Sequence, residues 1–338
     1  MKKIIGFILL LVLCVSMTAC GLPDNAQGDK TVYLKYVSDS SELIPLLVKG
    51  NAEYGVLGEP AVTMANAKAG TTSVLDLQDE YKKASGSDSL YTQAGVLVKG
   101  NLANDKNFMY KLYAALKNNK TWLLENVADV KAKLNACGSA LQVNFTAQTI
   151  ERCNLDSKDS LSIKADIEKY FTVIKEFDGT FIGGNLPSDD FYMECVQPTE
   201  DETTEDETTE EKGTITITVP DGAPALTVLS LNDTTISGYK IVVKVVSGAD
   251  LVLGSLTNGT SDIVVLPTNV CAKLYNKGMK VKLASVNIFG VLYMVGKTQV
   301  NSLDDLVGKT IYNIGMGGTP DLTLKYILKT NGYNYQEV

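Results

Sequence analysis

Short runs of alternating apolar and polar residues recur along the chain, and each is followed by a segment with helical spacing. Alternation of period two predicts strands, and apolar residues three to four apart predict helices. In the first half, strands are predicted at 31–37, 52–57, 71–77 and 93–98, and helices at 41–49, after 60, and at 105–126, 127–134, 146–152 and 161–177. Strands alternating with helices predict an α/β fold with parallel sheets and right-handed crossovers.

The second half repeats this pattern. Strands are predicted at 214–219, 240–246, 262–266 and 309–314, and helices at 249–256, 270–276, 302–307 and up to 329. Residues 281–295 are predicted as a strand pair, or as one long strand that breaks near Phe289 and Gly290.

Residues 198–213, PTEDETTEDETTEEKG, separate the two halves and contain no apolar residue. Such a segment buries no apolar surface to offset its conformational entropy. Its like charges also repel one another. We therefore predict an extended, disordered acidic linker.

The linker accounts for the net charge of the chain, which is −8 over 338 residues. Eight of the 39 acidic residues lie in it, and without these eight the chain has 31 acidic residues against 31 basic ones. A near-neutral folded part gives no reason to expect nucleic-acid binding. The sequence has no histidine, which excludes Ser-His-Asp and Cys-His catalysis and histidine metal sites.

The N-terminus has the pattern of an export signal. Lys2 and Lys3 precede an apolar run over 4–15, and Met17-Thr18-Ala19-Cys20 is similar to a bacterial lipobox. We predict a signal peptide at 1–19, a lipidated Cys20 and a tether at 20–30, so that an exported protein is anchored to the outer face of the bacterial membrane or lies in the periplasm. An ordinary signal peptide with a chance cysteine is the alternative.

Four further cysteines are Cys137, Cys153, Cys195 and Cys271. In an exported chain Cys137 and Cys153 could pair, but buried free thiols are the favoured interpretation.

An internal repeat becomes visible when the chain is shifted by 209 residues. In both copies a serine, a glycine, an acidic residue and two apolar residues then coincide: Ser38, Gly50, Glu53, Val56 and Leu57 fall on Ser247, Gly259, Asp262, Val265 and Leu266. Two similar α/β lobes predict a ligand cleft between them, at the carboxyl ends of the strands.

Several strings resemble the substrate-binding proteins of ABC importers, in the nitrate, sulfonate, taurine and thiamine-precursor group. They are TITITVPDGAPAL, VVSGADLVLGSLTNGTSDIVVLPTN, SLDDLVGKTIYNIGMGGTPDLTLKYIL, LKYVSDSSELIPLLVKGNAEYGVLGEPA and IGGNLPSDDFY. The resemblance implies a two-lobed type II periplasmic-binding-protein fold, each lobe being a mostly parallel sheet flanked by helices, with a hinge between the lobes.

The order of the strings is reversed relative to that family, which suggests a circular permutation. One lobe would then comprise 31–73 with 298–338, and the other 74–197 with 214–297. A truncated piece of a tandem array and lobes swapped between molecules remain as alternatives.

The resemblance implies that two lobes close on a small solute, anionic (sulfonate- or nitrate-like) or pyrimidine-like, and deliver it to the permease of an ABC importer, with no cofactor or metal. A sensing module for a membrane signalling partner is the main alternative. Enzymes of this fold are less favoured because the relatives that we considered depend on histidine.

Candidate ligand-binding residues lie in the loops that would face the cleft. Glycines allow a ligand to approach the backbone closely, and a helix N-terminus favours an anionic group of the ligand. Hydroxyls can donate hydrogen bonds to the ligand, and a carboxylate favours a ligand with an amine. The candidates are Ser38, Ser40, Glu59, Gly222, Ala223, Ser247, Gly248, Thr268, Asn269, Gly317, Gly318 and Thr319, with Asn287 and Phe289 taken from the resemblance.

Overall fold

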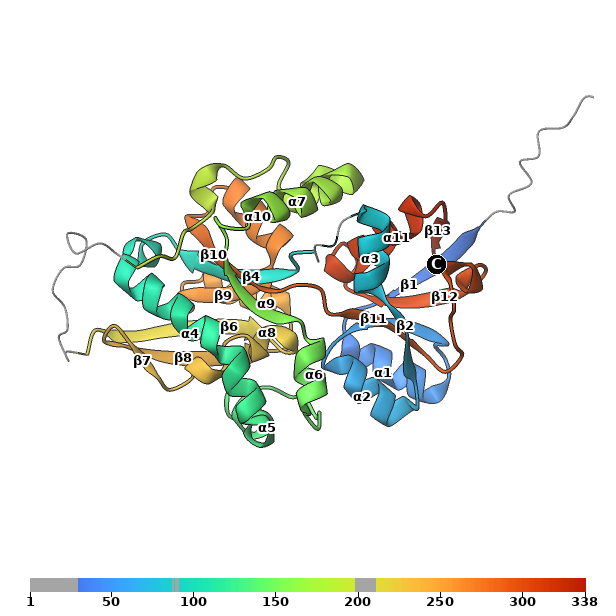
Figure 1. The fold of residues 1–338 in the computed structure, drawn as a ribbon, viewed down its shortest axis with the longest axis horizontal. Helices are drawn as coiled ribbons and strands as arrows, with labels where there is room; N and C mark the ends of the chain where they lie inside the picture. The colour runs from blue at the N-terminus through green and yellow to red at the C-terminus, as the bar shows by residue number, and fades with distance from the viewer. Residues whose placement is uncertain (1–29, 87, 89–90, 198–210) are drawn as a thin grey trace, which may run out of the picture.

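The computed structural model describes residues 30–86, 88, 91–197 and 211–338, and it folds them into two lobes, each built on one sheet flanked by helices (Figure 1). This confirms the predicted two-lobed α/β fold. The predicted signal peptide, Cys20 and nearly all of the acidic linker lie outside the described residues. Gly213, predicted as the last linker residue, is instead the first residue of a strand.

The first lobe, which we call the split lobe, takes its sheet from both ends of the chain. In order across the sheet, the strands are β13 (Asn334–Glu337), β1 (Thr31–Val37), β12 (Thr310–Ile314), β2 (Tyr54–Gly58), β11 (Leu292–Gly296) and β3 (Thr72–Asp76). Its helices are α1 (Ser40–Lys49), α2 (Ala61–Ala69), α3 (Leu77–Ser85) and α11 (Thr319–Thr330). The first four strands are parallel, and β11 runs antiparallel to β2 and β3.

The second lobe has a seven-stranded sheet. Its order is β5 (Leu155–Asp159), β10 (Val281–Ile288), β4 (Ala94–Lys99), β9 (Ile263–Pro267), β6 (Gly213–Pro220), β8 (Tyr239–Val246) and β7 (Thr235–Ile236). Its helices are α4 (Lys106–Glu125), α5 (Val127–Ala136), α6 (Ala147–Arg152), α7 (Lys164–Asp178), α8 (Ala223–Leu226), α9 (Ala249–Thr257) and α10 (Thr268–Asn276). Parallel pairing is confined to β8, β6 and β9, so this sheet is more mixed than expected.

Both sheets share one arrangement. A central strand, β12 or β6, lies between two parallel neighbours, which are β1 and β2 in the split lobe and β8 and β9 in the second. An antiparallel strand then follows, β11 or β4. The internal repeat in the sequence corresponds to β1–α1–β2 and β8–α9–β9, which occupy equivalent places in the two sheets.

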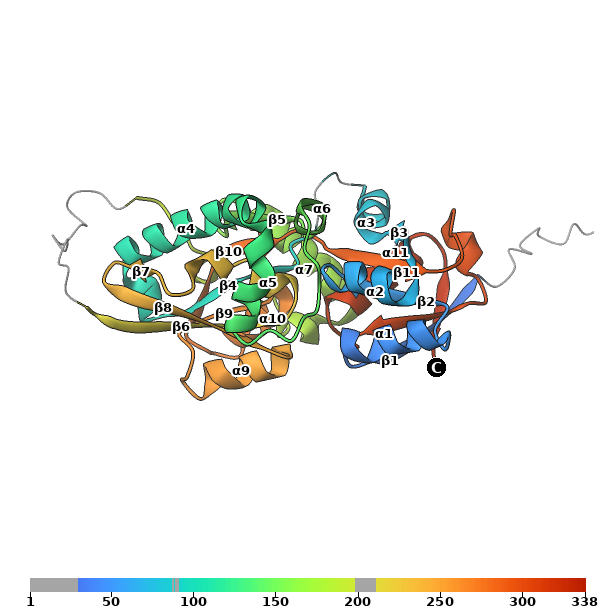
Figure 2. The ribbon, with the colours of Figure 1, turned by 90° about the horizontal axis from the view of Figure 1, so that it is seen from below.

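The described chain crosses between the lobes where α3 leads to β4 and where β10 leads to β11 (Figure 2). The predicted strand break near Phe289 and Gly290 is therefore a lobe crossing. Gly290 has φ +77°, and a Cβ there would lie 2.9 Å from Gln78 Cγ and 3.1 Å from the Tyr91 ring, so only glycine fits. The predicted lobe boundaries do not coincide with these crossings. The boundary at 73/74 falls inside β3, and the boundary at 297/298 lies beyond β11, because both strands pair within the sheet of the split lobe.

The core runs from one lobe into the other. A single apolar cluster joins Leu34 and Val56 of the split lobe to Leu266 and Leu283 of the second. Where the lobes meet, the Tyr170 ring of α7 lies 5.7 Å from the Tyr91 ring and 6.4 Å from that of Tyr81 in α3. The lobes are therefore packed against each other on this side.

The cysteines Cys137, Cys153, Cys195 and Cys271 are buried and free, as the favoured interpretation held. Among the described residues, no helix has both the length and the apolar character needed to cross a membrane.

The insertion of β1 between strands from the far end of the chain can be tested at Leu34. This side chain is fully buried in the cluster that also contains Ile311 and Leu324. Leu34→Ala should lower the free energy of unfolding by about 2–5 kcal/mol, measured by urea denaturation, because it deletes buried methyl groups and leaves a cavity. Leu161→Ala makes the same deletion at a 41% exposed position and should cost less than about 0.5 kcal/mol. Equal effects of the two variants would contradict this packing.

Candidate functional site

A cleft of about 420 Å³ lies between the lobes at the carboxyl ends of strands from both sheets. The split lobe contributes Asp39, Ser40, Ser41, Gly58, Glu59, Pro60, Ala61, Met64, Leu292, Ile314 and Pro320; the second lobe contributes Ala140, Leu141, Asp221, Gly222, Ala223, Pro224 and Ser247; and the crossings contribute Gln93 and Val291. Ligands of α/β proteins bind at this kind of position, outside the carboxyl ends of strands. The cleft is therefore the candidate binding site.

Five of the predicted residues line this cleft: Ser40, Glu59, Gly222, Ala223 and Ser247. Ser38 and Gly248 do not line it, although each lies close in sequence to a residue that does.

Asn287 and Phe289 are not in the cleft. Asn287 is buried in β10 and donates to Ser157 Oγ at 2.8 Å. Phe289 lines a different hollow, of about 450 Å³, where Lys158 lies 5.1 Å from the centre of its ring. The expected positions were wrong because β10 is the second strand from the β5 edge of the second sheet, and the chain that follows it reaches the cleft only at Val291.

The other predicted residues lie where the lobes pack together: Thr268, Asn269 and Thr319 are buried, and Gly317 and Gly318 are half-buried. Thr268 Oγ1 donates to Thr92 O at 2.5 Å, and Asn269 Nδ2 donates to Phe181 O at 3.5 Å. The Phe181 ring covers Gly317, where a Cβ would lie 2.8 Å from its Cε1 atom. Gly318 is the N-cap of α11, followed by the buried Thr319.

Three hydroxyls face one another in this interface without well-formed hydrogen bonds to described residues. Tyr170 of the second lobe lies against Thr319 and Thr323 of α11, and all three oxygens are buried. Burial raises the pKa of Tyr170 to about 12, so its hydroxyl stays a neutral donor at physiological pH. Buried hydroxyls without partners carry a desolvation cost, which the polar atoms of water or a solute could relieve.

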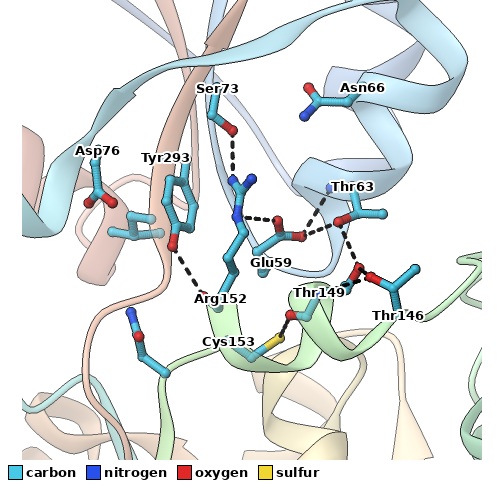
Figure 3. A network of polar contacts seen from close by, with 12 residues as sticks. Glu59, Thr63, Asn66, Ser73, Asp76, Thr146, Thr149, Arg152, Cys153 and Tyr293 are labelled. Carbon is cyan, nitrogen blue, oxygen red and sulfur yellow. Dashed lines mark hydrogen bonds and ion pairs between the residues drawn. The ribbon is translucent and has the colours of Figure 1, made fainter. Parts of the chain in front are cut away.

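An ion pair crosses between the lobes beside the cleft (Figure 3). Arg152, the last residue of α6, places Nε 3.0 Å from Oε1 of Glu59. The other oxygen, Oε2, accepts from Thr63 N at 3.0 Å and from Thr63 Oγ1 at 2.9 Å. The Glu59 carboxylate is thus fully engaged within the protein, and its side chain is 0% exposed, so it does not face a solute.

Arg152 makes two more contacts with the split lobe. Its Nη2 donates to Ser73 Oγ at 2.7 Å, and its guanidinium lies 4.3 Å from the centre of the Tyr293 ring. Tyr293 in turn donates its hydroxyl to Arg152 O at 3.3 Å. We call Glu59, Thr63, Ser73, Arg152 and Tyr293 the interlobe network.

Burial raises the pKa of Glu59 above its ordinary value of 4.5, and the hydrogen bonds from Thr63 and the charge of Arg152 oppose this rise. Without Arg152, the opposition would weaken and the pKa would rise further. The hydrogen bonds from Thr63 and the ion pair with Arg152 therefore both favour the ionised form of this buried carboxylate.

Sequence reasoning did not identify Arg152, although one signal for it exists. It is the only arginine in the sequence, among many lysines. A planar guanidinium can pair with a carboxylate and stack on an aromatic ring at the same time, which a lysine ammonium cannot do.

The chain was compared with protein families, curated proteins and solved structures. No family model matches the chain, and no curated protein matches it. One solved structure to which it is similar is the oligopeptide-binding protein AppA from Bacillus subtilis in complex with a nonapeptide. The identity is 10%, the alignment covers 80% of this chain and 57% of that one, and the TM-score is 0.33. A likeness this distant says nothing about the solute.

The interlobe network predicts a pH-dependent defect when its arginine is removed. Arg152→Met keeps an apolar stem but leaves Glu59 buried without a counter-charge, so we expect a loss of about 3–5 kcal/mol of unfolding free energy near neutral pH. A carboxyl whose pKa is raised by folding favours the folded state below its ordinary pKa of 4.5, and this contribution disappears as the pH rises through the folded value. The defect should therefore shrink as the pH falls toward 4.5.

Urea denaturation of wild type and variant at several pH values measures this difference. The matched control is the double variant Glu59→Gln/Arg152→Met, which has no titrating carboxyl at this place. The difference between its unfolding free energy and that of wild type should change less with pH than the difference for Arg152→Met. A defect in Arg152→Met that is small, or constant with pH, would show that the ion pair is not what holds this contact.

Proposed function

We propose that this chain is the solute-binding receptor of an ABC-type importer, which captures a small solute in the interlobe cleft and delivers it to a membrane permease. The observation that supports this proposal most directly is the cleft itself. Its lining loops follow strands of both lobes, so a solute held there contacts both lobes at once.

The mechanism that we propose is hinge closure. Two crossings join the lobes in the described chain, and they allow rotation of one lobe against the other. The interlobe network and the contact of Tyr170 with α11 join residues of opposite lobes. These contacts would stabilise the closed arrangement.

We also propose that the chain is a circular permutation of such a receptor. In support, β1 pairs in parallel with both β12 and β13, so the two ends of the described chain complete one sheet. The split sheet then repeats the arrangement of the uninterrupted one. A swap of strands between molecules is not needed, because β1 finds its place within the same chain.

Export and a lipid anchor on Cys20 belong to this proposal, but they rest on the sequence alone. The family that the sequence resembles implies nitrate-, sulfonate- or pyrimidine-like solutes. The residues that line the cleft are a more direct guide to the class of solute than this resemblance is.

The proposal can be tested by blocking the cleft. A thermal-shift screen would cover sulfonates, nitrate, bicarbonate, pyrimidines, amino sugars and polyamines. A solute at about 100 times its dissociation constant should stabilise the wild type by about 2.7 kcal/mol. Ser40→Tyr, which places a ring in the cleft, should abolish that stabilisation.

Val48→Tyr is the control, because Val48 lies on the same helix but is 47% exposed and outside the cleft. It should leave binding unchanged. Binding that survives Ser40→Tyr, or a panel in which no solute stabilises the wild type, would argue against a receptor that uses this cleft.

A further inference from the structure

We infer that the solute carries a positive charge, and that its cationic group binds between Asp39 of the split lobe and Asp221 of the second lobe. This inference rests on the proposed function and specifies the class of solute. It departs from the anionic solutes that the resemblance suggests.

Four helices that begin near the cleft, α1, α2, α9 and α11, have carboxylates at their N-termini, whereas the short helix α8 has none in its first turn. Asp39 caps α1, and Glu59 accepts from the backbone of Thr63 in the first turn of α2. Asp321 in the first turn of α11 accepts from Gly317 N at 2.8 Å. Asp250 lies in the first turn of α9. Because a helix N-terminus attracts an anion through its free N–H groups and its dipole, these carboxylates remove the attraction that an anionic solute would need.

Of the three acids that line the cleft, only Glu59 has a base beside it; Asp321, at the start of α11, has one as well. Glu59 pairs with Arg152, and Asp321 lies 3.0 Å from Lys325 Nζ. Asp39 and Asp221 both line the cleft, and neither forms an ion pair with any described residue. No lysine or arginine of the described chain lines the cleft. Within the described chain, the cleft therefore has two uncompensated negative charges, one on each lobe.

Both carboxylates keep capacity to accept further donors. Asp39 Oδ1 accepts from the backbone N and the hydroxyl of Ser41 at 2.7 and 2.6 Å, while its Oδ2 has no partner among the described residues. Asp221 Oδ1 accepts from Ser139 Oγ and Gly222 N, and its Oδ2 accepts from Ala140 N at 2.8 Å. An ionised carboxylate offers about four acceptor sites, so each can still take an ammonium donor.

The placement of the charges also links the cation to closure. Each lobe brings one carboxylate to the cleft, so closure brings like charges closer and is opposed by their repulsion. A cation between them converts this repulsion into attraction. Met64, Leu141 and Ile314 form an apolar wall of the cleft, which suits a cation with a short hydrocarbon chain.

The test uses four compounds with the same four-carbon chain: butane-1,4-diamine, butylamine, butane-1,4-diol and butane-1-sulfonate. Binding to the full mature chain is measured by calorimetry and thermal shift. The amines should bind more tightly than the diol, and the sulfonate should not bind. Asp39→Asn and Asp221→Asn should each weaken amine binding about tenfold or more, the scale of one charge-assisted hydrogen bond.

These substitutions are chosen to preserve the fold. Asparagine is as good an N-cap as aspartate, and at residue 221 its oxygen can still accept from Ser139. Asp129→Asn is the matched control: it neutralises an exposed acid in the first turn of α5, outside the cleft, and should leave amine affinity unchanged.

The outcomes separate this inference from the proposed function. Tighter binding of the sulfonate or the diol, abolished by Ser40→Tyr, would overturn the cationic inference and leave the receptor standing. Amine binding that Ser40→Tyr does not affect would overturn both. Failure of both amines to bind, or equal effects of the Asp39, Asp221 and Asp129 substitutions, would also overturn the inference.

Discussion

The structure depends on the pairing of β1 with two strands from the opposite end of the chain. β12 and β13 leave a place between them, and β1 fills it with parallel hydrogen bonding on both sides. This pairing fixes where β1 ends, and therefore where Asp39 and Ser40 enter the cleft. Without β1, the split lobe would lack both part of its core and one wall of the candidate site.

The contacts between the lobes fall into two kinds. One kind is the aromatic packing of Tyr81, Tyr91 and Tyr170 where the lobes meet. The charges, in contrast, are divided: Glu59 and Arg152 neutralise each other across the lobes, whereas Asp39 and Asp221 do not. In the mechanism that we propose, packing and the ion pair favour closure, and the two acids without a base oppose it until a cation lies between them.

The sequence allowed most of the fold to be predicted, because its central strands alternate clearly and its helices have marked apolar faces. It failed where strands are polar or peripheral: β5 and β13 contain mainly polar residues and are held by their neighbours rather than by a buried face of their own. The short helix α3 was missed as well. Ser40, Gly222 and Ser247 could be placed in the cleft because each lies within three residues of the end of a strand. Phe289 could not, because its position depends on where the chain leaves one sheet for the other.

Arg152 shows why the remaining part of the site is not visible in the sequence. Its contacts reach three separate places in the split lobe: Glu59 beside α2, Ser73 in β3 and Tyr293 in β11. None of these residues is near it in sequence, so only the packed fold brings them together. Because one planar side chain satisfies all three, a change in the position of α6 relative to the split lobe would disturb every one of these contacts at once. In the mechanism that we propose, the ion pair between the lobes therefore depends on this single arginine, whereas the acids proposed to bind the solute are divided between the two lobes.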